Sequence, residues 1–290
     1  MSDPRRHHHI PRYLLREWTG GDEQIEVVRR KGGEKLRFFR TSIMNVFQER
    51  DLYALENEDG TLDQRIEKDR YQQIDNLGSD LHRQVLAAVR QGKLPLLVGQ
   101  ARTAFVEVFI RTMVVRSPGT FDGPVARFDM EAAKKRALAT VVQNGADEAE
   151  QQALLSDPEA TRRVERNAVA YARARPSLET AEQLAALGLN FARVDDANCS
   201  FVVSDMLLDG AGLMDSEDLG AHRLWVPLAP DIAFRLEGDA NRLSALNRPQ
   251  VRSINERLYR QSATVASNSR TLLSSLARSC DRVRWRTRAR

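Results

Sequence analysis

The spacing of hydrophobic and polar positions changes several times along the chain, and each change predicts a different kind of element. Residues 24–55 contain β-prone stretches with Gly32 and Gly33 between the first two, which predicts a hairpin with a short turn. Apolar residues then recur at steps of three and four over residues 62–91. This spacing keeps them on one stripe and predicts a long amphipathic helix.

The middle of the chain has a helical pattern. Pro95 begins a stretch that is apolar on most sides and ends at Arg116, and we expect this helix to be central to the core. Residues 126–190 are rich in Ala, Glu, Arg and Gln and predict further helices. Short β-prone runs separated by turn residues follow, and residues 239–279 then return to a helical pattern.

This order of strands, many helices, strands and helix predicts an α+β fold, because regular alternation of strands and helices is absent. We therefore predict a predominantly helical single domain over residues 1–280. Its strands, from the N- and C-terminal parts, are expected to form one small, mainly antiparallel sheet. Residues 126–190 are an alternative helical subdomain. Residues 281–290 are expected to be a basic, flexible tail.

The charge is concentrated at the C-terminal end. The formal net charge is +4, but the last 13 residues hold six arginines and one aspartate, so the rest of the chain has a net charge of −1. A nucleic-acid-binding domain usually carries its basic face within the fold. The overall charge is therefore weak support for that function.

Composition and cysteine content indicate a cytoplasmic protein. No apolar run approaches the roughly 20 residues that span a bilayer, and the first 30 residues lack the pattern of a signal peptide. Cys199 and Cys280 have no metal-ligand spacing, and two isolated cysteines fit a reducing compartment better than a disulfide scaffold.

Standard catalytic and nucleotide-binding motifs are missing: the chain has no GxxxxGK[ST], GxGxxG, HExxH, GxSxG or CxxC sequence. Candidates come instead from looser clusters. The first is RRHHHIPRYLLREW, in which strand alternation places His7 and His9 on one side and His8 on the other. Histidine is the common base and metal ligand at neutral pH. The alternative is an N-terminal arm whose histidines hydrogen-bond the backbone.

The same stretch resembles the opening H-x-x-P-x-x-x-L-x-x-[FW] of the family called domain of unknown function 4238, with His8, Pro11, Leu15 and Trp18 at those positions. Further segments follow in the family's order: DLYAL, RIEKDRYQQID, FIRTMVVRSP, FVVSD, WVPLAPDIAFRL and VRSINERLYRQSATVAS. The resemblance covers residues 8–267. It implies a fold shared with many prokaryotic proteins and brings no established reaction with it.

The chain departs from the family at one turn. The family often has S-D-N-P after the late strand, whereas here Ser204 and Asp205 are followed by Met206.

An acidic cluster is the second candidate. Glu67 and Asp75 lie eight residues apart on the predicted helix, and Asp205 ends the predicted strand SFVVSD. His8 with these three carboxylates is a reasonable ligand set for Mg²⁺, Mn²⁺ or Zn²⁺. A metal-dependent hydrolase or nuclease-like effector would use His8, Glu67 and Asp205 as catalytic residues. The alternative is solvated helical carboxylates and a Ser-Asp turn or cap.

Arginines are the third candidate. Arg111 lies four residues after Glu107, so it forms either an ion pair on the helix or, with Arg116, a site for a bound anion. In the tail, Arg284, Trp285 and Arg286 combine charge with an aromatic ring, a pattern that binds nucleic acid or another anionic surface.

These arginines define a second functional hypothesis, a non-enzymatic module that binds nucleic acid or an anionic ligand. A third is an interaction protein in which the motifs only hold the fold. Asn255, Trp225 and Pro227 are interpreted as structural, since they lie among apolar positions of a helix and a strand.

Overall fold

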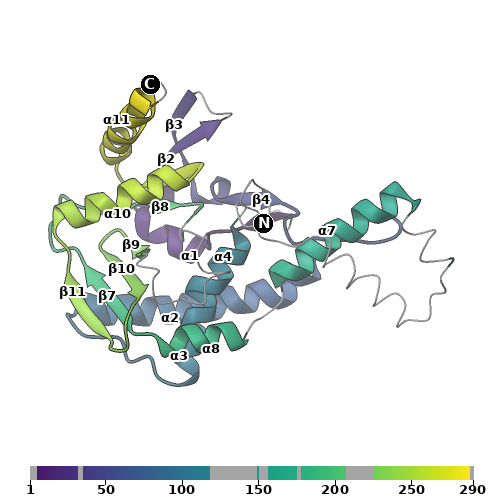
Figure 1. The fold of residues 1–290 in the computed structure, drawn as a ribbon, viewed down its shortest axis with the longest axis horizontal. Helices are drawn as coiled ribbons and strands as arrows, with labels where there is room; N and C mark the ends of the chain where they lie inside the picture. Colours follow the sequence, from purple (N-terminus) through teal and green to yellow (C-terminus); the bar gives the residue numbers. More distant parts are fainter. Residues whose placement is uncertain are drawn as a thin grey trace. The chain divides into compact units, whose positions relative to one another are not determined.

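The computed structural model describes residues 5–31, 35–117, 149, 156–174, 178–206 and 225–287. Helices and strands both contribute, as an α+β class requires, while the expectation of a predominantly helical chain stays a prediction (Figure 1). The α-helices are α1 (Arg12–Leu15), α2 (Gln72–Arg90), α3 (Gln100–Val106), α4 (Met113–Arg116), α7 (Pro158–Ala174), α8 (Leu178–Ala186), α10 (Arg248–Gln261) and α11 (Arg270–Thr287). Short 3₁₀ turns are Arg16–Trp18 and Ile43–Asn45, and π-helical segments are Ile66–Tyr71 and Glu107–Thr112.

The strands are β1 (Arg6–His8), β2 (Gln24–Lys31), β3 (Lys35–Ser42), β4 (Gln48–Arg50), β5 (Leu55–Glu56), β6 (Leu62–Asp63), β7 (Leu189–Arg193), β8 (Val203–Ser204), β9 (Val226–Ala229), β10 (Ile232–Leu236), β11 (Arg242–Ala245) and β12 (Thr264–Ser267). They form several small sheets, which corrects the expectation of one. The C-terminal strands divide because β12 pairs with the N-terminal hairpin while β7, β9, β10 and β11 pair among themselves.

The chain divides into two compact units. The first unit comprises residues 1–7, 49–74 and 118–176, and the second unit comprises residues 8–48, 75–117 and 177–290. Each unit is thus assembled from separate stretches of the chain, so composition along the sequence gives no signal of the division. Because one domain can contain two compact units, the single domain over residues 1–280 stays a prediction.

In the second unit, one sheet has the strand order β3-β2-β12-β8. Val28 of β2 pairs with both Phe38 of β3 and Val265 of β12, so strands from the two ends of the chain do meet. Helix α11 packs against β2 and β12 (Figure 1). Leu273 and Leu276 of α11 are fully buried in this core cluster.

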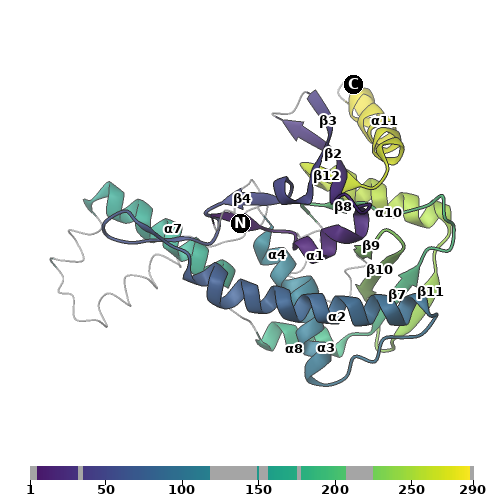
Figure 2. The ribbon, with the colours of Figure 1, turned by 180° about the vertical axis from the view of Figure 1, so that it is seen from behind.

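The other sheet of the second unit has the order β11-β7-β10-β9, in which β7 pairs antiparallel with β10 and parallel with β11 (Figure 2). Phe105 of α3 packs against this sheet, with ring centroids 6.0 Å from Phe191 and 4.9 Å from Phe234. Helix α3 also contacts α8. The prediction that the apolar stretch before Arg116 lies in the core is therefore confirmed from Phe105 onward, whereas Leu96 and Val98 of the same stretch are exposed.

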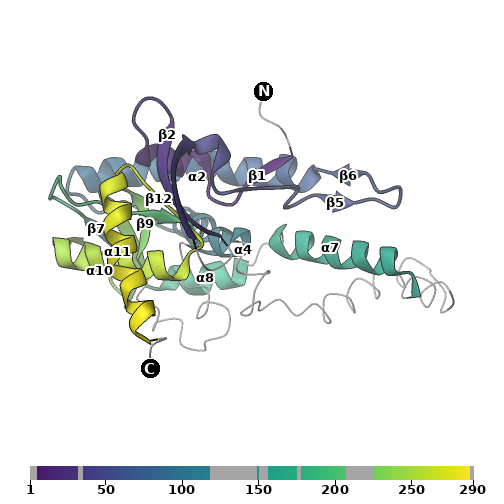
Figure 3. The same cartoon turned by 90° about the horizontal axis from the view of Figure 1, so that it is seen from above.

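The first unit contains the β5–β6 hairpin and helix α7 (Figure 3). Its core cluster includes Tyr53, Leu55, Tyr71 and Ala170, and α7 contacts β5. Tyr71 Oη donates a hydrogen bond of 2.8 Å to the Arg173 carbonyl, which ties the π-helical segment to the end of α7.

Three predicted elements differ from the structure. The helix expected over residues 62–91 begins only at residue 66, as a π-helical segment, because residues 62–63 pair as β6. The helix expected from Pro95 begins at Gln100. The helical pattern over residues 239–279 is interrupted by β11 and β12, since strand pairing with residues distant in sequence outweighs local preference.

Two predictions fall partly outside the described residues. Of the helices expected over residues 126–190, the structure describes residue 149 and residues 156–174 and 178–190, which contain α7 and α8. Of the flexible tail expected over residues 281–290, it describes the backbone of residues 281–287, which continues α11. No helix in the described part of the chain is long and apolar enough to cross a membrane.

Candidate functional site

The three opening histidines contact neighbouring backbone and aromatic rings. His7 is fully buried in the first unit, where its Nδ1 accepts the Tyr53 N–H at 3.0 Å and its ring stacks on the Tyr53 ring. In the second unit, His8 Nε2 lies 3.1 Å from the Ile43 carbonyl, and buried His9 meets Phe47 edge to face. The alternation of His7, His8 and His9 is as expected, since His7 and His9 are buried and His8 is half-buried.

The other residues of the family-like opening are part of the core. Leu15 and Trp18 are fully buried, and Trp18 Nε1 donates a hydrogen bond of 2.9 Å to the Phe201 carbonyl. Pro11 precedes α1, where its fixed φ suits a helix start. This motif therefore anchors the N-terminal segment to the residues that precede β8.

Asp205 closes a turn. Its Oδ1 accepts the Ala263 N–H at 3.1 Å and its Oδ2 accepts the Thr264 N–H at 2.8 Å, so the carboxylate holds the start of β12. Burial raises the pKa of Asp205 to about 6, while these two backbone donors act in the opposite direction. The carboxylate is thus already used by the backbone of its own unit.

Asp75 and Arg116 form a buried ion pair in the second unit. Arg116 Nη1 lies 2.8 Å from Asp75 Oδ1, and the Arg116 side chain is 1% exposed. Burial raises the pKa of Asp75, and Arg116 opposes that rise. Burial, and then the charge of Asp75, raise the pKa of the neighbouring Tyr13 phenol. Arg116 therefore has a structural role as the partner of a buried carboxylate. An ion pair was one of the two interpretations from the sequence, and a bound anion was the other.

Arg111 is also neutralised. Its Nη1 lies 2.8 Å from Glu107 Oε1, and both side chains are largely buried on the π-helical segment. This is the ion pair at four-residue spacing that the sequence indicates. Asn255 likewise has the structural role expected of it, because it accepts the Val202 N–H and donates to the Ser200 carbonyl.

The predicted metal ligands do not gather into a recognisable centre. Glu67 belongs to the first unit, whereas His8, Asp75 and Asp205 belong to the second. Within the described ranges, no group of three or more His, Cys, Asp and Glu side chains could hold a metal ion. A divalent metal at these four residues therefore has no support from the described side chains. The side chains of Arg284, Trp285 and Arg286 lie outside them.

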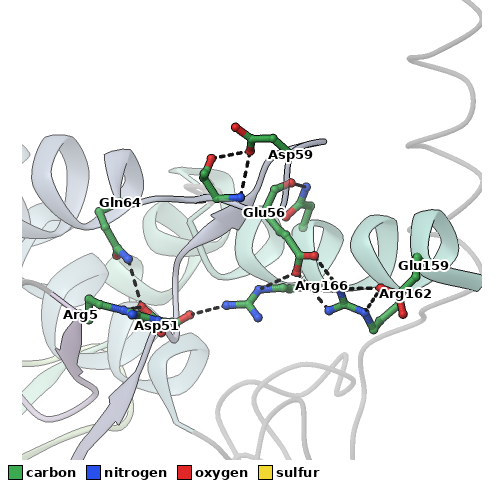
Figure 4. A network of polar contacts seen from close by, with 10 residues as sticks. Arg5, Asp51, Glu56, Asp59, Gln64, Glu159, Arg162 and Arg166 are labelled. Carbon is green, nitrogen blue, oxygen red and sulfur yellow. Dashed lines mark hydrogen bonds and ion pairs between the residues drawn. The ribbon is translucent and has the colours of Figure 1, made fainter.

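A polar network in the first unit holds β5 and its neighbours to α7 (Figure 4). Asp51 accepts hydrogen bonds from Arg5 Nε at 2.9 Å and Gln64 Nε2 at 3.1 Å, and Arg5 lowers its pKa most. Arg162 Nη2 lies 2.5 Å from Glu56 Oε1 and lowers the pKa of Glu56. The charges of Asp51 and Glu56 are balanced by Arg5 and Arg162, so this network is a structural clamp.

A pocket of about 390 Å³ in the second unit is the better candidate for a ligand site. Its volume falls within the usual range for small-molecule sites. Trp225, Arg235 and Ser244 line one side from β10, β11 and the start of β9, and α10 lines the other with Ile254, Arg257, Leu258 and Gln261. Apolar and hydrogen-bonding side chains thus face the same space.

Positive charge distinguishes this pocket. The Arg235 guanidinium lies 4.7 Å from the centre of the Trp225 ring and pairs with Glu237, while its buried Nε has no hydrogen-bond partner among the described residues. Arg257 is exposed and makes no hydrogen bond or ion pair within the described part of the chain. One guanidinium of the pocket is therefore free to bind an anion.

A second cavity, of about 520 Å³, differs in this respect. Its two arginines are neutralised, since Arg248 Nη2 lies 2.7 Å from Asp196 and Arg252 Nε lies 2.8 Å from Glu256. Cys199 lines it as a free thiol whose pKa is raised by burial. Among its described lining residues, this cavity therefore has no unpaired arginine that could bind an anionic ligand.

The first pocket was not predicted from the sequence. Trp225 was interpreted as a core residue but is only half-buried. One signal was present in the sequence. Arg235 interrupts the otherwise buried strand Ile232–Leu236. A cation within an apolar run needs either a partner or a ligand.

The fold and the pocket define an α+β protein with one ligand-sized, positively charged pocket among its described residues. The chain matches the family model described as a protein of unknown function, DUF4238, over residues 6–264, and it belongs to this family. No curated protein and no solved structure matches the chain.

Proposed function

We propose that the protein binds a small anionic molecule in the pocket beside Trp225. The observation that carries the proposal is the unpartnered guanidinium of Arg257 in a pocket that also contains Arg235 stacked on an indole ring. A guanidinium presents parallel N–H donors that match a carboxylate or a phosphate. Ile254, Leu258 and Trp225 supply apolar surface for the body of the ligand.

This proposal keeps the anionic-ligand hypothesis but moves it to other arginines. Arg111 and Arg116, for which the sequence left anion binding as one of two alternatives, are neutralised by Glu107 and Asp75. The competing hydrolase hypothesis depends on His8 and Asp205 being available, yet both contact backbone groups. A cytoplasmic location stays the prediction from the cysteine content.

The test is calorimetric titration of the full chain with two probes, benzoate and phenyl phosphate, which separate a carboxylate ligand from a phosphate ligand. We expect saturable binding of at least one probe, and Arg257→Gln is expected to weaken it about tenfold, since a charge-assisted hydrogen bond is worth about 1.5 kcal/mol.

Arg260→Gln is the matched control, because Arg260 lies on the same helix outside the pocket and pairs with Glu256. Its affinity should equal that of the unmodified chain. Failure of both probes to saturate at millimolar concentration, or equal affinities for Arg257→Gln and the unmodified chain, would overturn the proposal.

A further inference from the structure

Strand β11 has an open edge. It is the first strand in the order β11-β7-β10-β9 and pairs only with β7 (Figure 1). The other strands of this sheet are almost wholly buried, whereas three of the four residues of β11 are exposed. An uncovered sheet edge presents backbone groups on which another extended segment can pair.

The backbone groups of this edge follow from the pairing with β7. Leu246 N–H donates to the Arg193 carbonyl at 2.9 Å, and the residues whose backbone groups face a neighbouring strand alternate along the chain. The N–H and carbonyl groups of Leu243 and Ala245 therefore face away from β7. Neither residue makes a further hydrogen bond within the described part of the chain.

The edge of β11 has little protection against such pairing. Edge strands are often protected by proline, a bulge or several charged side chains. Strand β11 contains no proline, and its register with β7 runs without a shift from Arg242 to Ala245. Arg242 is its one charged residue. A single positive charge does not prevent pairing, and it favours a partner that carries carboxylates.

The same strand leads into the candidate ligand pocket. Ser244, Ala245 and Leu246 line the pocket, so its wall includes the end of the open edge. The pocket also contains the unpartnered guanidinium of Arg257. Arg242 is likewise exposed and makes no hydrogen bond or ion pair within the described residues, and strand alternation places it on the same face as Ser244.

We propose that β11 and the pocket together bind a short, extended acidic peptide by strand addition. The peptide backbone pairs with the free N–H and carbonyl groups of Leu243 and Ala245, and a glutamate or aspartate side chain of the peptide binds Arg257. The proposal rests on the proposed function and specifies its ligand, because the anion in the pocket is then a peptide carboxylate.

A second copy of this chain fits the edge less well. If two β11 strands paired, each would contribute Arg242 and no carboxylate, because the strand sequence is RLSA. No negative charge would then reach Arg257 from the added strand. Charge complementarity therefore favours a peptide that brings its own carboxylates.

Calorimetric titration of the full chain with the synthetic peptide acetyl-EVTVTE-amide tests the proposal. A glutamate at each end lets a carboxylate reach the pocket in either strand direction, and valine and threonine favour an extended conformation. We expect saturable binding. Arg257→Gln should weaken it about tenfold, because a charge-assisted hydrogen bond is lost, whereas Arg260→Gln should not. The peptide acetyl-QVTVTQ-amide should bind more weakly by a similar factor.

Two methylated peptides test the backbone pairing directly. One carries N-methyl groups on the first, third and fifth residues of EVTVTE, and the other carries them on the second, fourth and sixth. Only one of these alternating sets of N–H groups faces β11 in an added strand. One methylated peptide should therefore bind as the parent does, and the other should bind more weakly by about tenfold or more.

A variant of the chain makes the same comparison from the other side. Ala245→Pro removes the outward N–H nearest the pocket and should weaken binding of acetyl-EVTVTE-amide by about tenfold, while Ala245→Ser keeps this group and should bind as the unmodified chain does. The methylated peptides require no change in the chain, so they decide the question even where Ala245→Pro fails to fold.

Absence of saturation by acetyl-EVTVTE-amide, or equal affinities of the two methylated peptides, would overturn the proposal. A concentration-dependent dimer that Ala245→Pro abolishes, found in place of peptide binding, would overturn it as well and assign the edge to a second copy. Saturable binding of benzoate without binding of the peptide would sink this inference alone and leave the proposed function standing.

Discussion

At the scale of single residues, Asp205 connects two parts of the second unit. The same carboxylate accepts the N–H groups of Ala263 and Thr264, and the Asp205 N–H donates to the Thr264 carbonyl at 3.1 Å. These bonds align β8 with β12. Because this turn depends on the side chain of Asp205, replacing that residue should lower the free energy of unfolding.

We predict that Asp205→Ala lowers the free energy of unfolding by about 2 kcal/mol at pH 7, because two N–H groups lose a charged acceptor. Denaturation in urea measures this. Ser204→Ala, which removes only the bond from Ser204 Oγ to the Met206 carbonyl, is a neighbouring control and should cost less.

The stability of the unmodified chain and that of Asp205→Ala should depend differently on pH. Burial raises the pKa of Asp205 from 3.8 to about 6, so between these values the folded state holds a proton that the unfolded state has released. The stability that this group contributes is therefore greatest below pH 4 and falls as the pH rises to 6. The difference between the unmodified chain and Asp205→Ala should shrink over this interval; a constant difference would contradict the assignment.

Gly78 illustrates a tight approach between a helix and an aromatic ring. A Cβ atom at this position of α2 would overlap the Tyr13 hydroxyl and lie 2.9 Å from Val108 Cγ1. We predict that Gly78→Ala destabilises the protein by about 1–3 kcal/mol, although alanine is the better helix former. Thermal denaturation measures this, and Gly78→Ala in a Tyr13→Phe background should recover part of the loss.

Single residues differ in how far the sequence predicts them. The structural role of Asn255 was expected, and the Arg111–Glu107 pair was one of the two alternatives that its four-residue spacing left open. Arg257 and Trp225 could not be placed, because their pocket forms only where β10, β11 and α10 come together. The local periodicity of a segment does not indicate which distant elements it packs against.

At the scale of elements, the N-terminus of α10 is capped by side chains. The Asn247 side chain accepts the Gln250 N–H at 3.0 Å, and Gln250 Oε1 accepts the Asn247 N–H at 2.9 Å, which forms a capping box with Pro249 in the first turn. This signal is present in the sequence and defines the helix boundary at residue 248.

We predict that Asn247→Ala costs about 1 kcal/mol of stability, since the cap loses its acceptor, whereas Asn247→Asp costs less than half as much. Chemical denaturation of both variants tests this. Equal losses for the two substitutions would show that the carbonyl oxygen of the cap is not what matters.

Strand β12 shows why other boundaries are hard to predict. Only four residues long and flanked by α10 and α11, it lies in a stretch whose local pattern is helical. It is a strand because Val265 and Ala266 are buried between β2 and β8. Its conformation is thus decided by partners from distant parts of the chain.

At the scale of the whole molecule, the two units differ in how their carboxylates respond to acid. In the first unit, Arg5 lowers the pKa of Asp51 and Arg162 lowers that of Glu56. In the second unit, burial raises the pKa of Asp75 and Asp205, while Glu256 has a lowered pKa that offsets part of this effect.

We predict that the first unit weakens before the second as the pH falls below about 4. Lowered pKa values contribute stability that is lost when the carboxylates are protonated, whereas raised values contribute stability that protonation restores. Hydrogen exchange followed by mass spectrometry at pH 6, 4.5 and 3.5 should show residues 158–174 losing protection first. Earlier loss in β2 and β12 would contradict this order.

The fold class and the core position of the central helices follow from composition and periodicity. The number of sheets and the two units do not, because each depends on which distant segments pair. Every segment of the first unit is followed along the chain by a segment of the second. Amphipathic stripes indicate that an element is buried but not which neighbour buries it.

The pairing of Val28 with Val265 has a consequence for biosynthesis. These partners lie 237 positions apart, so at a translation rate of 5–20 residues per second the ribosome needs about 10–50 s to deliver the second after the first. Throughout that interval the early hairpin has an open edge that nascent chains or chaperones can occupy. The sheet β3-β2-β12-β8 can therefore close only after β12 has left the ribosome.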